Sequence, residues 1–267
     1  LFALARADSA ATSVFCRECI QPPLFSKICA IAALHMLGEL DWSEMEPLIR
    51  RLLVACDDPY VLLNLVDALA GGKYPLAPET TGALLKLLCT SPNREVVQRL
   101  AELLGSRPEL DVFDALAEGF EHFEPWRKSL GLQVLGRRVL LDKQVRNPGG
   151  LTELLYHVLR GDEEALRVEA ALILWHMGDD YAGKLLKEFL MASTIESAIR
   201  VLQALGPSLP AELVPALLPM LSSEHAGLHE ALREVIAGEV APETARNLCD
   251  LALAARGLGE IETASED

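Results

Sequence analysis

The chain has 267 residues, of which 51% are hydrophobic and 5% aromatic, and its formal net charge at pH 7 is −15. This length and hydrophobic content are enough for a large buried core, and the low aromatic fraction suits a protein built mainly from leucine and alanine. The acidic charge disfavours binding to duplex DNA or to anionic membranes, because phosphate recognition needs a basic face. The sequence also lacks an uncharged apolar stretch of about 18 residues, so it predicts no membrane-spanning helix.

The first 23 residues contain neither an initiating methionine nor a charged leader. We expect residues 1–23 to form an N-terminal capping helix or the remnant of a preceding segment. Cys16 and Cys19 in this region form a Cys-x-x-Cys pair, which is compatible with two unreactive thiols, half of a zinc site or a redox couple. The other cysteines lie one to a predicted helix, where we expect them to be small buried side chains: Cys29, Cys56, Cys89 and Cys249. This cysteine usage favours a reducing compartment, and hence a cytoplasmic location.

From residue 26 onward an apolar run that ends in glycine recurs seven times. The glycines are Gly38, Gly71, Gly105, Gly136, Gly178, Gly206 and Gly238, separated by 28 to 42 residues. A glycine at the end of an apolar run is typical of a helix C-cap in the left-handed conformation, which glycine adopts at little cost because it has no Cβ. We therefore expect each of these glycines to end a helix, with a second apolar helix following it.

The apolar periodicity predicts two helices in each repeat. The first helices are expected near residues 26–37, 59–70, 94–104, 125–140, 163–177, 194–205 and 226–237. The second helices are expected near residues 43–55, 78–89, 109–120, 149–159, 180–191, 210–221 and 242–255. The sequence Asp57-Asp58-Pro59 marks one boundary, because proline cannot continue the preceding helix but fits the first turn of the next.

These elements predict an all-α protein, specifically an α-α superhelix (solenoid) of about seven stacked antiparallel helix pairs. Strand signals are almost absent from the sequence. We expect residues 24–255 to form one continuous repeat array, and residues 256–267 to form an acidic, disordered tail. The strongest turn cluster, Asn147 to Gly150, is expected to be a longer loop within the array.

Three stretches carry the repeat most clearly, residues 33–38, 170–178 and 201–206, each followed by an apolar second helix. This pattern resembles the HEAT-repeat family, and in particular its short bacterial variety, over roughly residues 24 to 255. The resemblance implies a non-catalytic scaffold that binds a protein or peptide and needs no cofactor. It leaves open an enzyme accessory or lyase of the HEAT-like bilin-lyase type, in which the groove would hold a tetrapyrrole. A HEAT-like DNA glycosylase is a further alternative, which the acidic charge disfavours.

The resemblance also suggests where a partner would bind, because the second helices of HEAT-like arrays line the concave side. The outward polar residues that we expect on these helices are Arg50, Arg51, Lys86, Tyr156, His157, Lys184, Lys187 and Arg246. This set is basic against an acidic background. It predicts a groove that accepts an acidic protein or peptide, and the competing interpretation is an ordinary solvated face.

Two further sequence patterns bear on function. Residues 107–124 are mainly acidic and residues 127–146 mainly basic, which indicates either solvated outer faces of opposite sign or a bipolar docking surface. His225 and His229 have the i, i+4 spacing of a metal site, but a helix is expected to begin between them, so a solvated turn is the favoured interpretation. The sequence shows no catalytic constellation and predicts no metal site.

Overall fold

A computed structural model describes residues 9–20, 27–72, 74–107, 109–141, 150–192, 194–206, 209–217, 220, 225–237 and 242–250. These residues form helices and the connections between them, without any strand, so the expected all-α class is confirmed for this part of the chain. Contacts among the helices divide the chain into two compact units, Leu1–Leu151 and Thr152–Asp267. The expected tail, residues 256–267, lies outside the described residues.

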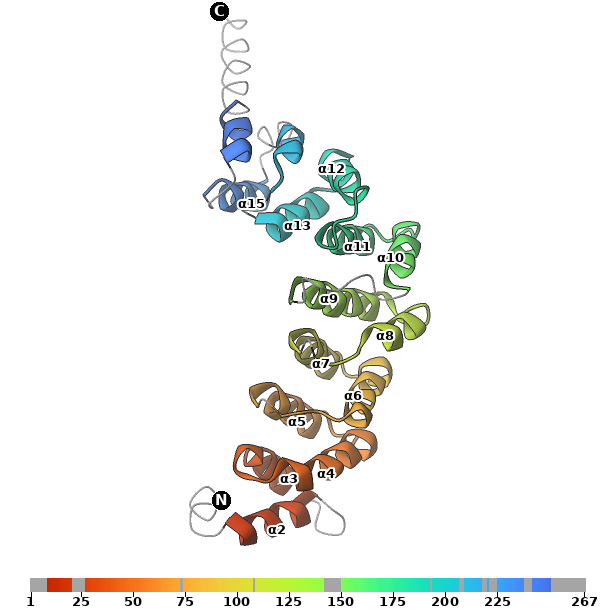
Figure 1. The fold of residues 1–267 in the computed structure, drawn as a ribbon, viewed down its shortest axis with the longest axis vertical. Coiled ribbons are helices and arrows are strands. Elements are labelled where there is room, and N and C mark those ends of the chain that lie inside the picture. The colour runs from red at the N-terminus through yellow and green to blue at the C-terminus, as the bar shows by residue number, and fades with distance from the viewer. Residues whose placement is uncertain are drawn as a thin grey trace, which may run out of the picture. The chain divides into compact units, whose positions relative to one another are not determined.

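The first unit contains two rows of helices that alternate along the chain (Figure 1). It begins with α2 (Ser9–Ile20). The first row consists of α3 (Lys27–Leu34), α5 (Pro59–Gly71), α7 (Arg94–Ser106) and α9 (Pro125–Leu141). The second row consists of α4 (Trp42–Ala55), preceded by the short 3-10 helix η1 (Leu37–Glu39), α6 (Pro78–Thr90) and α8 (Phe113–Phe120). Within each row every helix packs on the next one, and α2 packs on both α3 and α4.

The second unit contains α10 (Leu151–Leu159), α11 (Glu164–His176), α12 (Ala182–Ala192), α13 (Ile195–Leu205), the 3-10 helix η3 (Ala211–Leu217) and α15 (Ala226–Ala237). Residues 242–250 are also helical. Helix α13 packs on both α11 and α15, and α12 packs on η3, around a shared apolar core. The helix expected near residues 210–221 is present in the described residues as the 3-10 helix η3, which contains Pro215.

Several helix starts follow directly from the local sequence. Asp58 precedes α5, and its Oδ1 accepts hydrogen bonds from the backbone N–H groups of Tyr60 (2.9 Å) and Val61 (3.2 Å). Asn93 and Thr194 accept a backbone N–H in the same way at the starts of α7 and α13. Such caps satisfy N–H groups that have no partner inside the helix. The predicted boundary before Pro59 is therefore confirmed.

The glycines of the repeated phrase do not all end helices. Gly206 ends α13 as expected, but its φ of +47° and ψ of −132° are not those of a left-handed C-cap. The left-handed C-cap is confirmed at Gly178 (φ +80°). It is wrong for Gly38, Gly71, Gly105 and Gly136, none of which has a positive φ, and Gly238 lies outside the described residues. Gly105 and Gly136 lie inside α7 and α9. Gly105 is buried where α7 meets α9, and a Cβ there would lie 3.1 Å from Cδ of Arg137, so this glycine serves close helix packing rather than a turn.

Polar side chains join successive helix pairs in the first unit. The indole N–H of Trp42 donates to the carbonyl oxygen of Pro75 (2.8 Å), and the same indole ring stacks on Tyr74 with ring centroids 4.6 Å apart. One turn further along α4, the carboxylate of Glu46 accepts a hydrogen bond from the backbone N–H of Ala77 (2.6 Å). These two contacts hold α4 against the loop that leads into α6.

Candidate partner-binding surface

The predicted binding residues of the first unit lie on two helices that pack against each other, α4 and α6. Arg50 is half-buried, and its Nη1 lies 3.9 Å from Oε2 of Glu79 at the start of α6. Arg51 and Lys86 are exposed. The structure therefore brings these three basic residues onto neighbouring helices, with Arg50 engaged in an ion pair and the other two facing solvent.

The predicted residues of the second unit lie on three separate segments. Tyr156 on α10 donates its hydroxyl to Oδ2 of Asp179 (2.9 Å), and this hydrogen bond raises the pKa of the tyrosine above its ordinary value. Lys184 and Lys187 are exposed and share α12, and His157 on α10 and Arg246 in the helix 242–250 are also exposed. The hydroxyl of Tyr156 thus holds the loop before α12, whereas both lysines are available to a partner.

The second helices also carry exposed acidic residues. On α8 the exposed charged side chains are Asp114 and Glu118, and on α12 Glu188 follows Lys187. The exposed charges of the second row in the first unit are therefore mixed on α4 and α6, where Glu44 and Glu79 accompany Arg51 and Lys86, and acidic on α8. A partner with charges of both signs suits this surface better than a uniformly acidic one.

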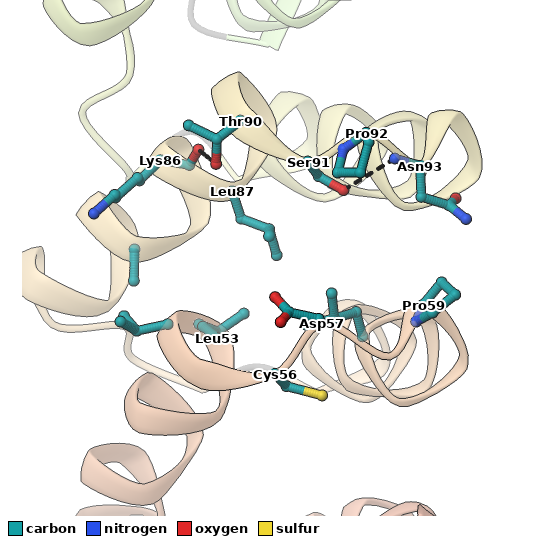
Figure 2. A pocket seen from close by; sticks show the side chains of 13 residues that line it. Leu53, Cys56, Asp57, Pro59, Lys86, Leu87, Thr90, Ser91, Pro92 and Asn93 are labelled. Atoms are coloured by element: carbon teal, nitrogen blue, oxygen red, sulfur yellow. Dashed lines mark hydrogen bonds between the residues drawn. The ribbon is translucent and has the colours of Figure 1, made fainter.

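An open cavity of about 510 Å³ lies between successive repeats of the first unit (Figure 2). Its walls come from the ends of α4 and α6, from the start of α5 and from the loop before α7. Most of the lining is apolar, and it includes Val54, whose exposed fraction is 66%. The volume lies within the range of pockets that hold small ligands, about 300–1,000 Å³. No sequence signal indicated this cavity, because its walls come from segments about 30 residues apart.

Most polar groups that line this cavity are already hydrogen-bonded. The hydroxyl of Thr90 donates to the carbonyl oxygen of Lys86 (2.8 Å), and Oγ of Ser91 accepts from the backbone N–H of Asn93 (3.3 Å). Oδ1 of Asn93 accepts from the backbone N–H of Val96 (3.1 Å) as the cap of α7. Two charged groups remain, the carboxylate of Asp57 and the ammonium of Lys86, and neither forms an ion pair with a residue that the structure describes.

The segment expected to be a basic outer face contains two buried arginines. Arg127 and Arg138 on α9 are only 7% and 5% exposed. Arg127 donates to the carbonyl oxygens of Leu88 and Ser91, the latter at 2.8 Å. Arg138 donates to the carbonyl oxygens at Arg107 and Leu110. The expectation of a solvated or docking face is therefore wrong at these two positions, because their guanidinium groups satisfy backbone carbonyls at the ends of the preceding helices. Lys143 and Arg146 lie outside the described residues.

The repeated sequence pattern contains a signal for the contact of Arg138. Arg107 and Arg138 both stand two residues after a glycine of the repeated phrase, Gly105 and Gly136. Arg107 makes the equivalent contact one repeat earlier, where its guanidinium donates to the carbonyl oxygens of Gly72 (3.2 Å) and Tyr74 (2.7 Å). Arg107 and Arg138 therefore occupy equivalent positions in successive repeats, and both serve a structural role there.

The cysteine pair in α2 is buried. All six cysteines are free thiols, and Cys16 and Cys19 are almost fully buried. Burial raises the pKa of the Cys19 thiol to about 11, and the neighbouring Cys29 adds to the effect. A buried thiol with a raised pKa is a poor nucleophile, which supports the interpretation of two unreactive thiols.

Neither a metal-binding cluster nor a membrane-spanning helix is present among the described residues. Within the described ranges, no group of three or more His, Cys, Asp or Glu side chains is placed to hold a metal ion. His225 and His229 are both exposed, His225 just before the start of α15 and His229 in its first turn. None of the helices in the part of the chain that the structure describes is both long and apolar enough to cross a membrane.

The chain was compared with known proteins. A scan against protein-family models gave no match, and a search of curated proteins gave no similar sequence. The resemblance to HEAT repeats therefore stays a prediction from the repeated sequence pattern.

Proposed function

We propose that the protein is an α-solenoid scaffold of the HEAT-like type that binds a partner protein or peptide along its second-helix face. The observation that carries this proposal is the cavity of about 510 Å³ between the ends of α4 and α6, which leaves apolar side chains open to solvent on that face. Concave sites with apolar walls and a few polar groups are common binding places in proteins.

The packing of the first unit supports the proposed architecture. Helices α3, α5, α7 and α9 pack one on the next, and so do α4, α6 and α8. In a repeat protein each unit contacts its neighbours in this way, and successive helices of one row present a continuous surface. The exposed basic residues Arg51 and Lys86 add a means of orienting a partner on that surface, because charge complementarity fixes register.

A site-specific crosslinking experiment tests the binding face. A photo-crosslinking amino acid replaces Val54 on α4 in one variant and the exposed Gln98 on α7 in the matched control. Each labelled chain is irradiated in a lysate of its native cells, and crosslinked partners are identified by mass spectrometry. We expect a saturable product at Val54 that excess unlabelled chain removes, and no such product at Gln98. A product from Gln98 alone would move binding to the first-helix face and overturn the proposal.

Charge reversal tests the basic residues of the same face. We expect Arg51→Glu and Lys86→Glu together to abolish the crosslink at Val54 while folding is retained, because both side chains are exposed. Reversal of the exposed Arg99 and Arg137, on α7 and α9, serves as the control. Arg138 is unsuitable for that control because it is buried.

A further inference from the structure

The cavity between α4 and α6 combines apolar walls with two unpaired charges. We propose that it receives one apolar side chain of a partner peptide, and that Asp57 and Lys86 recognise a basic and an acidic residue on the two sides of that side chain. This inference rests on the proposed function and deepens it, because it names the kind of segment that the second-helix face would bind.

The walls of the cavity suit an apolar side chain. Leu53 near the end of α4 and Leu87 in α6 line the cavity from its two sides, and Leu87 points into the gap (Figure 2). Val54 lies beside Leu53, and an occupant would remove its largely exposed side chain from water. A side chain of leucine or phenylalanine size would thus bury apolar surface on both helices at once.

The two charges lie on different sides of this apolar site. The carboxylate of Asp57 stands in the gap between the two helices, whereas the ammonium of Lys86 points away from it (Figure 2). The other polar groups of the lining that hydrogen-bond, Thr90, Ser91 and Asn93, have partners within the chain. Asp57 and Lys86 are therefore the charged groups left to select an occupant.

Electrostatic complementarity then defines the peptide. A basic residue of the occupant would be attracted to Asp57, and an acidic residue would be attracted to Lys86. An apolar occupant beside Asp57 lowers the access of water to that carboxylate, which strengthens its attraction to the basic residue. The predicted motif is an apolar residue with a basic residue on one side and an acidic residue on the other.

Selection from a library of random linear peptides displayed on phage tests this motif with the full chain as bait. Parallel selections use the unmodified protein, Lys86→Glu, Asp57→Lys and Ala83→Trp, which places an indole in the cavity. We expect the unmodified protein to enrich the predicted motif. The Lys86→Glu selection should exchange the acidic residue for a basic one, and the Asp57→Lys selection should exchange the basic residue for an acidic one.

A synthetic peptide with the enriched sequence then gives the affinity by fluorescence anisotropy. Ala83→Trp should weaken binding at least tenfold, whereas Gln98→Trp, which adds the same ring to an exposed position of α7, should leave it unchanged. If Ala83→Trp fails to fold, as its melting curve would show, the Lys86→Glu and Asp57→Lys selections decide whether the inference holds. Absence of an enriched motif, or a motif that neither the filled cavity nor the reversed charges alter, overturns the inference.

The crosslinking experiment separates this inference from the proposed function. A saturable partner crosslink at Val54 that persists in Ala83→Trp would retain the second-helix face as the binding surface and reject the cavity as its peptide site. If the selections enrich no motif and Val54 gives no saturable crosslink, the proposed function is rejected as well.

Discussion

At the scale of single residues, the same residue type serves opposite purposes in this chain. Gly178 provides a left-handed turn after α11, whereas Gly105 provides space where α7 meets α9. Glycine is costly in a helix interior because it loses more conformational freedom than other residues. Gly105 is the last residue but one of α7, where the absence of a Cβ leaves room for α9.

Replacement of Gly105 by leucine tests this role. We expect Gly105→Leu to lower the free energy of unfolding by about 1–3 kcal/mol, because extra atoms in a packed contact force neighbouring side chains and helices to shift. Gly82→Leu on α6 is the matched control, since a Cβ at Gly82 has no neighbour within 4 Å. The control should be about 0.5–1 kcal/mol more stable than the unmodified protein, because leucine favours helix more than glycine does. Urea denaturation followed by circular dichroism measures both, and equal effects of the two changes would contradict the packing role.

A second residue-scale prediction concerns pH. Oε1 of Glu164 accepts hydrogen bonds from the backbone N–H and the hydroxyl of Thr194, both at 3.0 Å, and from the hydroxyl of Ser197. The bond from Ser197 contributes most to lowering the pKa of this carboxyl below its ordinary value of 4.5. A lowered folded-state pKa means that the ionised group stabilises the fold above the unfolded pKa, and that this contribution is lost as the pH falls through the folded pKa.

We therefore expect Glu164→Gln to be less stable than the unmodified protein at pH 7, with a difference that shrinks as the pH falls below about 4.5. Urea midpoints at several pH values measure the difference. Glu163→Gln is the neighbouring control, because the side chain of Glu163 is exposed and makes no capping hydrogen bond. A difference that stays constant with pH would mean that the charge of Glu164 contributes nothing.

At the scale of elements, buried arginines link the helices of one row to the ends of the helices before them. Arg127 binds carbonyl groups at the end of α6, and Arg138 binds carbonyl groups in the connection between α7 and α8. The last carbonyls of a helix have no partner within the helix, so a guanidinium with five donors is well suited to this position.

Replacement of Arg138 tests the contribution of this link. Arg138→Met keeps much of the apolar stem but leaves the carbonyls at Arg107 and Leu110 without their guanidinium donor. We expect a loss of about 2–4 kcal/mol in the free energy of unfolding, because buried groups that lose a charged partner are costly. The adjacent Arg137 is exposed, and Arg137→Met should change stability by less than about 0.5 kcal/mol. Chemical denaturation of both variants measures the contrast, and a similar small effect at both positions would refute the link.

At the scale of the whole molecule, the open prediction is that the helix pairs of both units form one solenoid. A compact globule of this length would have a radius of gyration of about 18 Å. A continuous array, in which each repeat contacts only its neighbours, is longer than such a globule. We expect small-angle X-ray scattering of the monomer to give a clearly larger radius of gyration. A value near that of the globule would reject the continuous array, although the helix rows of the first unit would remain.

The secondary structure was largely determined by the sequence itself. The predicted first helices at 59–70, 94–104 and 125–140 agree with α5, α7 and α9 within two residues at either end. Their boundaries depend on local features, such as the cap of Asp58 and the proline at the first helical position, which act within one turn of the chain. Apolar periodicity likewise depends only on neighbouring residues.

Tertiary structure alone decided which arginines are buried and where a cavity opens. Arg137 and Arg138 are adjacent, and only Arg138 reaches the carbonyl groups of the preceding repeat. These outcomes depend on residues about 30 positions away, so no local pattern contains them. The candidate site follows the same rule. Lys86 was identified from the sequence, but the cavity between α4 and α6 forms only where two repeats pack together, and this packing makes Asp57 part of its lining.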